Sequence, residues 1–190
     1  RQRLFGEASQ PWIFWLDADE IVRPELAGEI ARTLSEEPGK AGFEVNRMVR
    51  IQGRWVRHGD WFPDWNLRLF RRDRWRMEDR AVHERVDVDG PVGRLREILE
   101  HHSFRDWEDR RQRAERYAAL WADQAWRAGR RAAPWDPATH AAGSLARGFL
   151  LKAGFLDGRL GWRVACSNAR EVALKYRLLR GRWRSGGTPS

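Results

Sequence analysis

The order of apolar and polar residues divides the chain into a strand-rich first half and a helical second half. Residues 11–16 form a short apolar and aromatic run that is typical of a buried strand. Apolar residues then recur at helical spacing over residues 24–37, which predicts a helix that begins with a proline. Alternation with period two follows in residues 41–52 and 66–70, and it predicts two further strands.

Three shorter strands are expected before the helices, around Trp75, at 82–88 and at 95–99. From Asp106 onward the pattern is helical, with Asp106 as the N-cap of a helix that Gly129 ends. Two more helices are predicted at 139–156 and 160–180. This order predicts a mixed α/β fold followed by a C-terminal helical annex.

Charge is distributed unevenly over the 190 residues, a length that suits one domain with a sizeable core. The net charge is +9, but residues 1–100 hold 18 basic and 19 acidic side chains, whereas 101–190 hold 18 and 8. The positive excess therefore lies in the second half and suggests an anionic partner there. The single cysteine, Cys166, excludes an internal disulfide, and no apolar stretch approaches the ~20 residues that span a bilayer.

The first predicted strand ends in three carboxylates, within the sequence Asp17-Ala18-Asp19-Glu20. Burying carboxylates without a charge partner is costly, and the usual partner at such a position is a divalent cation. On an extended backbone Asp17 and Asp19 point to the same side and can share one ion. The alternative is a solvated acidic turn. A phosphatase motif of the haloacid dehalogenase type fits less well, because residues 20–24 are neither small nor hydroxylated.

Two other clusters follow hydrophobic segments, His83-Glu84 and His101-His102. Carboxylates and an imidazole can hold Mg²⁺ or Mn²⁺ on a diphosphate, while a separate carboxylate takes the proton from an attacking hydroxyl. These residue types therefore indicate metal-assisted group transfer from a nucleotide donor. The alternative for His83-Glu84 is a pair of structural hydrogen bonds, and Trp55, Trp61 and Trp65 either pack or stack on sugar rings.

Several motifs in this order resemble the family 2 glycosyltransferases with the GT-A fold, in particular the bacterial lipopolysaccharide core branch of WaaE/KdtX-like β-glucosyltransferases. The motifs are Trp12 to Glu20, Gly59 to Arg72, Val82-His83-Glu84, Gly90 to Leu95, His101 to Phe104 and Gly154 to Arg159. The resemblance covers roughly residues 1–180. It implies a truncated GT-A domain, a mixed sheet with a Rossmann-like remnant, followed by the helical annex.

The resemblance implies an inverting, metal-dependent transfer of a sugar, commonly glucose, from a UDP-sugar to a lipopolysaccharide core or related glycolipid. It also implies a bacterial enzyme at the cytoplasmic face of the inner membrane. Only 16 residues precede Asp17, where a GT-A domain normally has its nucleotide-binding half. We therefore expect the chain to be a piece of a longer protein. The expected parts are a metal and acceptor half at 1–104, a membrane-associating helical region at 105–184 and a disordered tail at 185–190.

The resemblance also assigns roles to individual residues. Asp17, Asp19, Arg68 and Arg71 would bind the donor diphosphate. The metal ligands would be Asp17, Asp19 and His101. Glu84 would be the catalytic base, with Asp64 as its competitor. The partners implied are the UDP-sugar, the lipid-linked acceptor and an anionic membrane surface, without nucleic acid.

Two other functions compete with this hypothesis. One is a non-catalytic relic that keeps the fold, and the other is a basic nucleic-acid-binding module suggested by the arginine content. The basic stretch 170–184 also has two possible interpretations. It is either a solvated helix surface or a docking face for anionic lipid, where each basic residue adds ~1 kcal/mol.

Overall fold

The computed structural model describes residue 5 and residues 7–36, 39–78 and 85–185, and within this chain two compact units are distinguished. The sheet unit comprises residues 1–49 and 63–102, and the helical unit comprises 50–62 and 103–190. Residues 50–62 thus belong with the helices, whereas the sequence had suggested a single boundary near residue 104. Of the tail predicted to be disordered, 186–190 lies outside the described residues.

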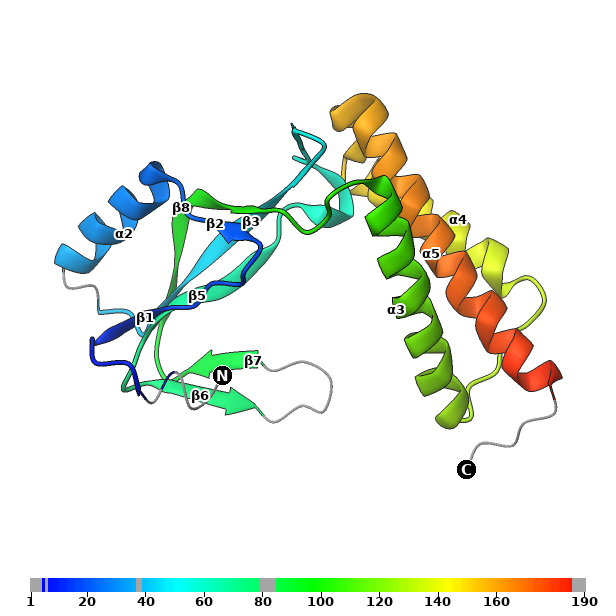
Figure 1. Ribbon diagram of the computed structural model, residues 1–190, viewed down its shortest axis with the longest axis horizontal. Helices are drawn as coiled ribbons and strands as arrows, with labels where there is room; N and C mark the ends of the chain where they lie inside the picture. The colour runs from blue at the N-terminus through cyan, green and yellow to red at the C-terminus, as the bar shows by residue number, and fades with distance from the viewer. Residues whose placement is uncertain (1–4, 6, 37–38, 79–84, 186–190) are drawn as a thin grey trace. The chain divides into compact units, whose positions relative to one another are not determined.

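The sheet unit is built on a curled, mixed sheet in the strand order β1-β5-β3-β8-β2 (Figure 1). The strands are β1 (Trp12–Phe14), β2 (Glu20–Ile21), β3 (Gly42–Ile51), β5 (Trp65–Arg71) and β8 (Val92–His101). β3 and β8 are parallel, and the other neighbours in this order are antiparallel. A separate hairpin is formed by β6 (Trp75–Glu78) and β7 (Arg85–Val88). The predicted mixed α/β class is therefore confirmed.

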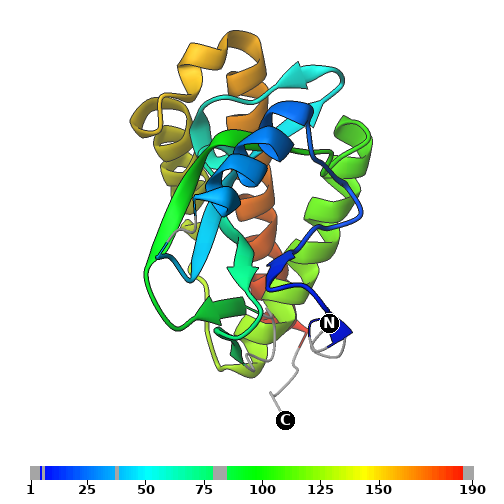
Figure 2. The ribbon, with the colours of Figure 1, turned by 90° about the vertical axis from the view of Figure 1, so that its left-hand side faces the viewer.

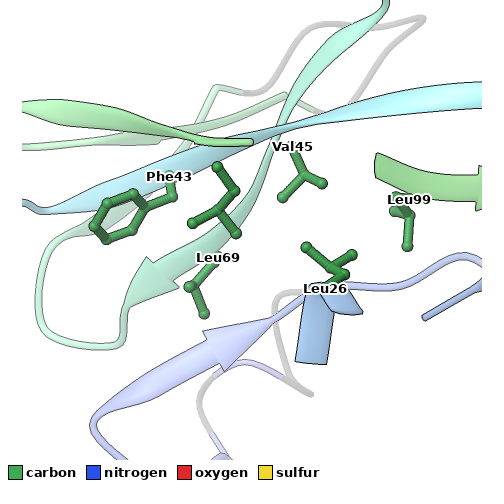
Figure 3. Packing of buried hydrophobic residues seen from close by; sticks show 6 residues of the cluster. Leu26, Phe43, Val45, Leu69 and Leu99 are labelled. Atoms are coloured by element: carbon green, nitrogen blue, oxygen red, sulfur yellow. The ribbon is translucent and has the colours of Figure 1, made fainter. Parts of the chain in front are cut away.

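Helix α2 (Pro24–Ser35) covers one face of this sheet, as the turned view in Figure 2 shows. It begins at the predicted proline, which fits the first turn because its missing N–H would have no helical partner there. Leu26 is fully buried and packs among Phe43, Val45, Leu69 and Leu99 (Figure 3). Burying one such leucine contributes about 2 kcal/mol. This cluster fixes the strands whose ends carry the acidic residues.

The register of β3 shifts near its start, between Phe43 and Glu44 against β5 and between Glu44 and Asn46 against β8. An irregularity of this kind bends a strand and changes the direction of the side chains that follow. Asn46 and Arg47 come directly after it. Both contribute to the candidate site described below.

The helical unit consists of three long helices and a compact connector (Figure 1). Its elements are β4 (Arg54–Trp55), η1 (Gly59–Trp61), α3 (Trp107–Arg127), α4 (Asp136–Ala146), η2 (Arg147–Leu151), η3 (Gly154–Asp157) and α5 (Gly158–Arg184). β4 pairs with the last two residues of β3, which belong to this unit. The Asp106 side chain accepts a hydrogen bond from the Asp109 N–H at 2.8 Å, which confirms the predicted N-cap. The helix predicted at 139–156 instead begins at Asp136 and breaks into η2 and η3.

Three glycines explain that break. A Cβ on Gly161 would lie 1.8 Å from the carbonyl oxygen of Gly154, and one on Gly154 would lie 2.5 Å from that of Gly148. The backbones of η2, η3 and the first turn of α5 therefore touch directly, which an uninterrupted helix would not permit. Asp157 secures the connector further, because its carboxylate accepts hydrogen bonds from the backbone N–H groups of Arg57 at 2.8 Å and His58 at 3.0 Å.

Candidate functional site

The acidic elbow, Asp17 to Glu20, is a turn that leads from β1 to β2. The Glu20 N–H donates to the Asp17 carbonyl oxygen at 3.1 Å, with Ala18 and Asp19 at the corner. The expectation of an extended backbone through Asp19 was therefore wrong. The chain must turn here because β1 pairs with β5 while β2 pairs with β8, at opposite ends of the sheet order. As a result, Asp17 and Asp19 contact different partners.

Asp17 and Glu20 enclose the guanidinium of Arg68 from β5. Arg68 Nη2 lies 2.6 Å from Asp17 Oδ2 and 2.5 Å from Glu20 Oε1. The Glu20 side chain has no exposed surface and that of Arg68 is 5% exposed, so each needs the other to offset the loss of hydration. Arg68 Nε is buried and has no hydrogen-bond partner among the described residues, so the guanidinium has a donor to spare. The predicted phosphate ligand is thus already paired with carboxylates.

A second guanidinium, that of Arg47, was not predicted from the sequence. Its Nε and Nη2 donate to Asp64 Oδ2 at 2.9 and 2.7 Å, and its Nη1 lies 3.3 Å from Glu20 Oε1. Burial opposes its charge, but the carboxylates of Asp64 and Glu20 outweigh that effect and raise the pKa of Arg47. The sequence did contain a sign of its role. In β3 every second residue is apolar, at Phe43, Val45, Val49 and Ile51, and Arg47 occupies a position in that apolar series.

Asp64, the competing candidate base, holds Arg47 in place. Its Oδ1 accepts a hydrogen bond from Asn66 Nδ2 at 2.9 Å, and its backbone N–H donates to Asn46 Oδ1 at 2.8 Å. Both carboxylate oxygens therefore accept hydrogen bonds from neighbouring side chains. In the structure, Asp64 thus contacts Arg47 through one carboxylate oxygen and Asn66 through the other.

Asp19 and His101 lie together although 82 positions separate them in the sequence. His101 Nε2 is 3.4 Å from Asp19 Oδ2, and the His102 N–H donates to the Asp19 carbonyl at 2.8 Å. This follows from the pairing of β2 with β8, in which Glu20 is opposite His101. Burial, helped by the positive charge of Arg47, lowers the pKa of His101 and outweighs the opposing effect of Asp19 and Glu20. The imidazole is therefore neutral at neutral pH.

The side chains of Arg71 and His102 pair with carboxylates outside this group. Arg71 pairs with Asp73, at 3.1 Å from Nε to Oδ1, and its guanidinium lies over Trp12. His102 Nε2 lies 2.9 Å from Glu100 Oε1. Glu84, the predicted base, and its neighbour His83 lie outside the described residues. The structure thus brings Asp17, Asp19, Asp64, Arg68 and His101 to one region and directs Arg71 to another.

The donor set suits a cation held by two protein ligands. Within residues 5, 7–36, 39–78 and 85–185 there is no group of three histidine, cysteine or acidic side chains with metal-binding geometry. Adjacent ligands of an octahedral Mg²⁺ are ~3 Å apart, and Mg²⁺ commonly takes only one or two carboxylates together with water and phosphate. The 3.4 Å separation of Asp19 and His101 fits that arrangement. Asp17 fits it less well, because its carboxylate is bound to Arg68.

Electrostatics favour a cation as well. The elbow and Asp64 supply four carboxylates, and Arg47 and Arg68 supply two guanidinium groups, which leaves a formal charge of −2. A neutral His101 does not change this sum. A divalent cation would balance it.

A cavity of about 980 Å³ opens beside these groups within the sheet unit. Its lining includes Trp15, Asp17, Arg47, Trp65, Asn66 and Arg68. This volume is at the upper end for small-molecule sites, and it combines charged and aromatic walls. Trp65 belongs to this wall, whereas Trp61 packs against Phe104 and Trp107 in the helical unit, with ring centroids 5.2 and 6.2 Å away. Of these two tryptophans, only Trp65 lines the cavity, where the Arg94 guanidinium lies 4.7 Å from the centre of its ring.

A scan against protein-family models gave no match for this chain, and a search of solved structures gave none either. The fold and the charged cavity therefore carry the functional argument. In the part of the chain that the structure describes, no helix combines the length and the apolar character needed to cross a bilayer.

Proposed function

We propose that the sheet unit is the metal and acceptor half of a GT-A glycosyltransferase of family 2. The donor would be a UDP-sugar, with glucose as the first candidate, and the acceptor a lipid-linked core oligosaccharide. The transfer would be inverting and would take place at the inner face of a bacterial membrane. Two observations support this proposal. Asp17 of the elbow lines one cavity together with Trp65, Asn66 and Arg68 of β5, and Asp19 of the elbow lies beside His101 at the end of β8.

The observation that carries the proposal is the contact between Asp19 and His101. An acidic turn and a histidine from distant parts of the sequence lie 3.4 Å apart, beside paired arginines and an aromatic wall. A carboxylate and an imidazole in contact are types of ligand that a divalent ion can use beside a diphosphate.

Each group has a role in this proposal. Asp19 and His101 would hold Mg²⁺ or Mn²⁺, which supplies a Lewis acid for the diphosphate when it is bound. Asp17 and Glu20 position Arg68, and Arg47 presents positive charge to the cavity. Trp15 and Trp65 offer aromatic faces to a sugar ring. Asp64 already accepts hydrogen bonds at both oxygens, so Glu84 remains the first candidate for the base.

Asp19→Asn tests the metal assignment, because it removes one charged ligand and keeps the shape of the side chain. We expect the affinity for Mn²⁺ in the presence of UDP to fall at least about tenfold, measured by isothermal titration on this chain and on any longer natural form. Asp73→Asn is the matched control, since Asp73 pairs with Arg71 away from the cavity. Equal affinity in the wild type and Asp19→Asn would refute the role of Asp19. A wild type that binds neither ligand would favour a non-catalytic relic.

Glu84→Gln tests the base separately from binding. We expect unchanged donor affinity and loss of sugar transfer, because glutamine keeps the size of the side chain but cannot accept the proton. Transfer is measured with a radiolabelled UDP-sugar and a lipid-linked core acceptor. Normal turnover in this variant would assign the base to Asp64 or another group.

A further inference from the structure

The connector of the helical unit exposes an unusual group of large apolar side chains. They are Leu150, Leu151, Phe155, Leu156 and Trp162, and we call them the apolar tip. Leu151 is 83% exposed and Leu156 is 60% exposed. Single exposed leucines are common on protein surfaces, but several large apolar residues gathered within one short segment mark an interaction site.

Aromatic contacts and close backbone packing support the apolar tip. The Phe149 ring joins two of its members, with centroids 6.3 Å from Phe155 and 5.2 Å from Trp162. The glycine contacts between η2, η3 and α5 fix the backbone beneath it. The exposed side chains therefore stand on a rigid support at the end of the helical unit where α5 begins (Figure 1, orange).

A row of cations starts at the same end of α5. We call it the arginine stripe, and its members are Arg159, Arg163, Arg170, Arg177 and Arg184. The last four are seven residues apart, close to two helical turns, and therefore lie on one face. All five are exposed, and none forms an ion pair with a carboxylate among the described residues. Trp162 lies within one turn of both Arg159 and Arg163.

Together these two features match the chemistry of an anionic phospholipid surface. Leucine and aromatic side chains insert between lipid headgroups and acyl chains, while arginines bind the phosphates around them. The excess of 18 basic over 8 acidic side chains in residues 101–190 strengthens the attraction. A protein partner would need acidic residues opposite the arginine stripe and an apolar pocket for the apolar tip. An anionic bilayer supplies phosphates for the stripe and an apolar interior for the tip.

We propose that the helical unit docks on an anionic phospholipid bilayer by inserting the apolar tip, with the arginine stripe against the headgroup phosphates. The inference deepens the proposed function, since a lipid-linked acceptor requires such docking. It does not depend on metal or donor, so vesicle binding can be measured with neither present. Asp19→Asn should bind vesicles as the wild type does, and the two proposals therefore fail separately.

Leu156→Asp and Leu120→Asp form a matched pair, because these leucines are 60% and 58% exposed and only the first belongs to the tip. In flotation with vesicles of equimolar phosphatidylglycerol and phosphatidylcholine, we expect Leu156→Asp to weaken binding at least about tenfold. Leu120→Asp should bind within a factor of about two of the wild type. Unchanged circular dichroism shows that both variants are folded. Equal losses in both would overturn the role of the tip.

The stripe is tested by Arg170→Gln/Arg177→Gln against Arg116→Gln/Arg127→Gln, an exposed pair on α3 with the same change in charge. We expect roughly a fivefold loss per stripe arginine on anionic vesicles and a smaller loss for the α3 pair. Added salt should weaken wild-type binding in the same direction. If both double variants lose the same affinity, only the total charge matters for binding. That result would contradict the specific role of the arginine stripe.

Insertion itself is measured with a fluorophore. Cys166 is the only cysteine, so Cys166→Ser/Leu151→Cys places a nitrobenzoxadiazole label on the tip, and Cys166→Ser/Leu120→Cys is the control. On anionic vesicles we expect a blue shift and quenching by a lipid-phase quencher at residue 151 alone. A label at 151 that stays in water would refute insertion. So would a blue shift that requires protein self-association instead of vesicles, because a second copy would then cover the tip.

Discussion

Arg68 of the sheet unit lies among carboxylates, whereas α5 of the helical unit carries a row of arginines that face solvent. Arg68 in the sheet unit is 5% exposed and lies between Asp17 and Glu20. Arg170 and Arg177 in the helical unit are exposed and have no acidic partner among the described residues. Arg68 and the two α5 arginines are thus the same residue type under opposite conditions of hydration.

The difference shows where stability and recognition reside. A buried guanidinium must be matched by charge, so its pairs are part of the folded structure and constrain the cavity beside them. An exposed guanidinium keeps its hydration and contributes little to folding, so it remains available to a phosphate outside the protein. Substitutions that remove one charge from each unit separate these two uses.

Arg68→Met should give the largest effect. It leaves Glu20 buried without its closest cation, and breaking a buried pair costs about 3–5 kcal/mol. Arg170→Met removes the same charge from a hydrated position and should change the free energy of unfolding by less than about 0.5 kcal/mol. Urea unfolding measures both, and Glu20→Gln added to Arg68→Met should recover part of the loss. A similar loss of unfolding free energy in Arg68→Met and Arg170→Met would contradict the contrast between buried and exposed arginines.

Gly161→Ala tests how far the close backbone packing of the connector stabilises the helical unit. Its new Cβ would lie 1.8 Å from the Gly154 carbonyl oxygen, and such overpacking costs about 3 kcal/mol. Gly143→Ala in α4 is the control, since a Cβ there meets nothing within 4 Å and alanine should stabilise the helix by up to about 1 kcal/mol. Thermal unfolding should therefore shift in opposite directions for the two variants. If Gly161→Ala leaves the unfolding temperature unchanged, the backbone of the connector must shift to accommodate the added Cβ.

The smallest effect is expected from acidification of the metal-free protein. Burial and Arg47 hold the pKa of His101 below the ordinary value of 6.5. The unfolded chain therefore takes up a proton more readily than the folded one. Stability from the neutral imidazole is complete above pH 6.5 and declines as the pH falls through the folded pKa. His101→Gln should flatten this part of the stability profile, and NMR titration should give a midpoint below 6.5 for His101.

The sequence predicted those features that depend on local pattern. The proline at the start of α2, the Asp106 cap and the strands at residues 42–51 and 65–71 all follow from periodicity and capping chemistry. The meeting of the elbow with His101 was implied by the family resemblance. It is realised by the pairing of β2 with β8.

Other features depend on contacts that no local pattern reports. The chain turns at Ala18-Asp19 because β1 and β2 occupy distant positions in the sheet. The side chains of Asp17 and Asp19 therefore do not point to the same side, as an extended backbone would have required. Arg47 was not predicted, because its partners Asp64 and Glu20 are distant from it in the sequence.

The glycines beneath the apolar tip fix its backbone, and this backbone does not depend on which apolar side chains the tip exposes. Leu151 and Leu156 could be exchanged for other large apolar residues without disturbing any packed neighbour, since their side chains point into solvent. Gly154 and Gly161 have no such freedom, because any side chain there would collide with backbone. Selection for folding alone would therefore preserve the support while the side chains it carries drift. Among related chains, retention of large apolar residues at 151 and 156 would accordingly report selection for what they touch.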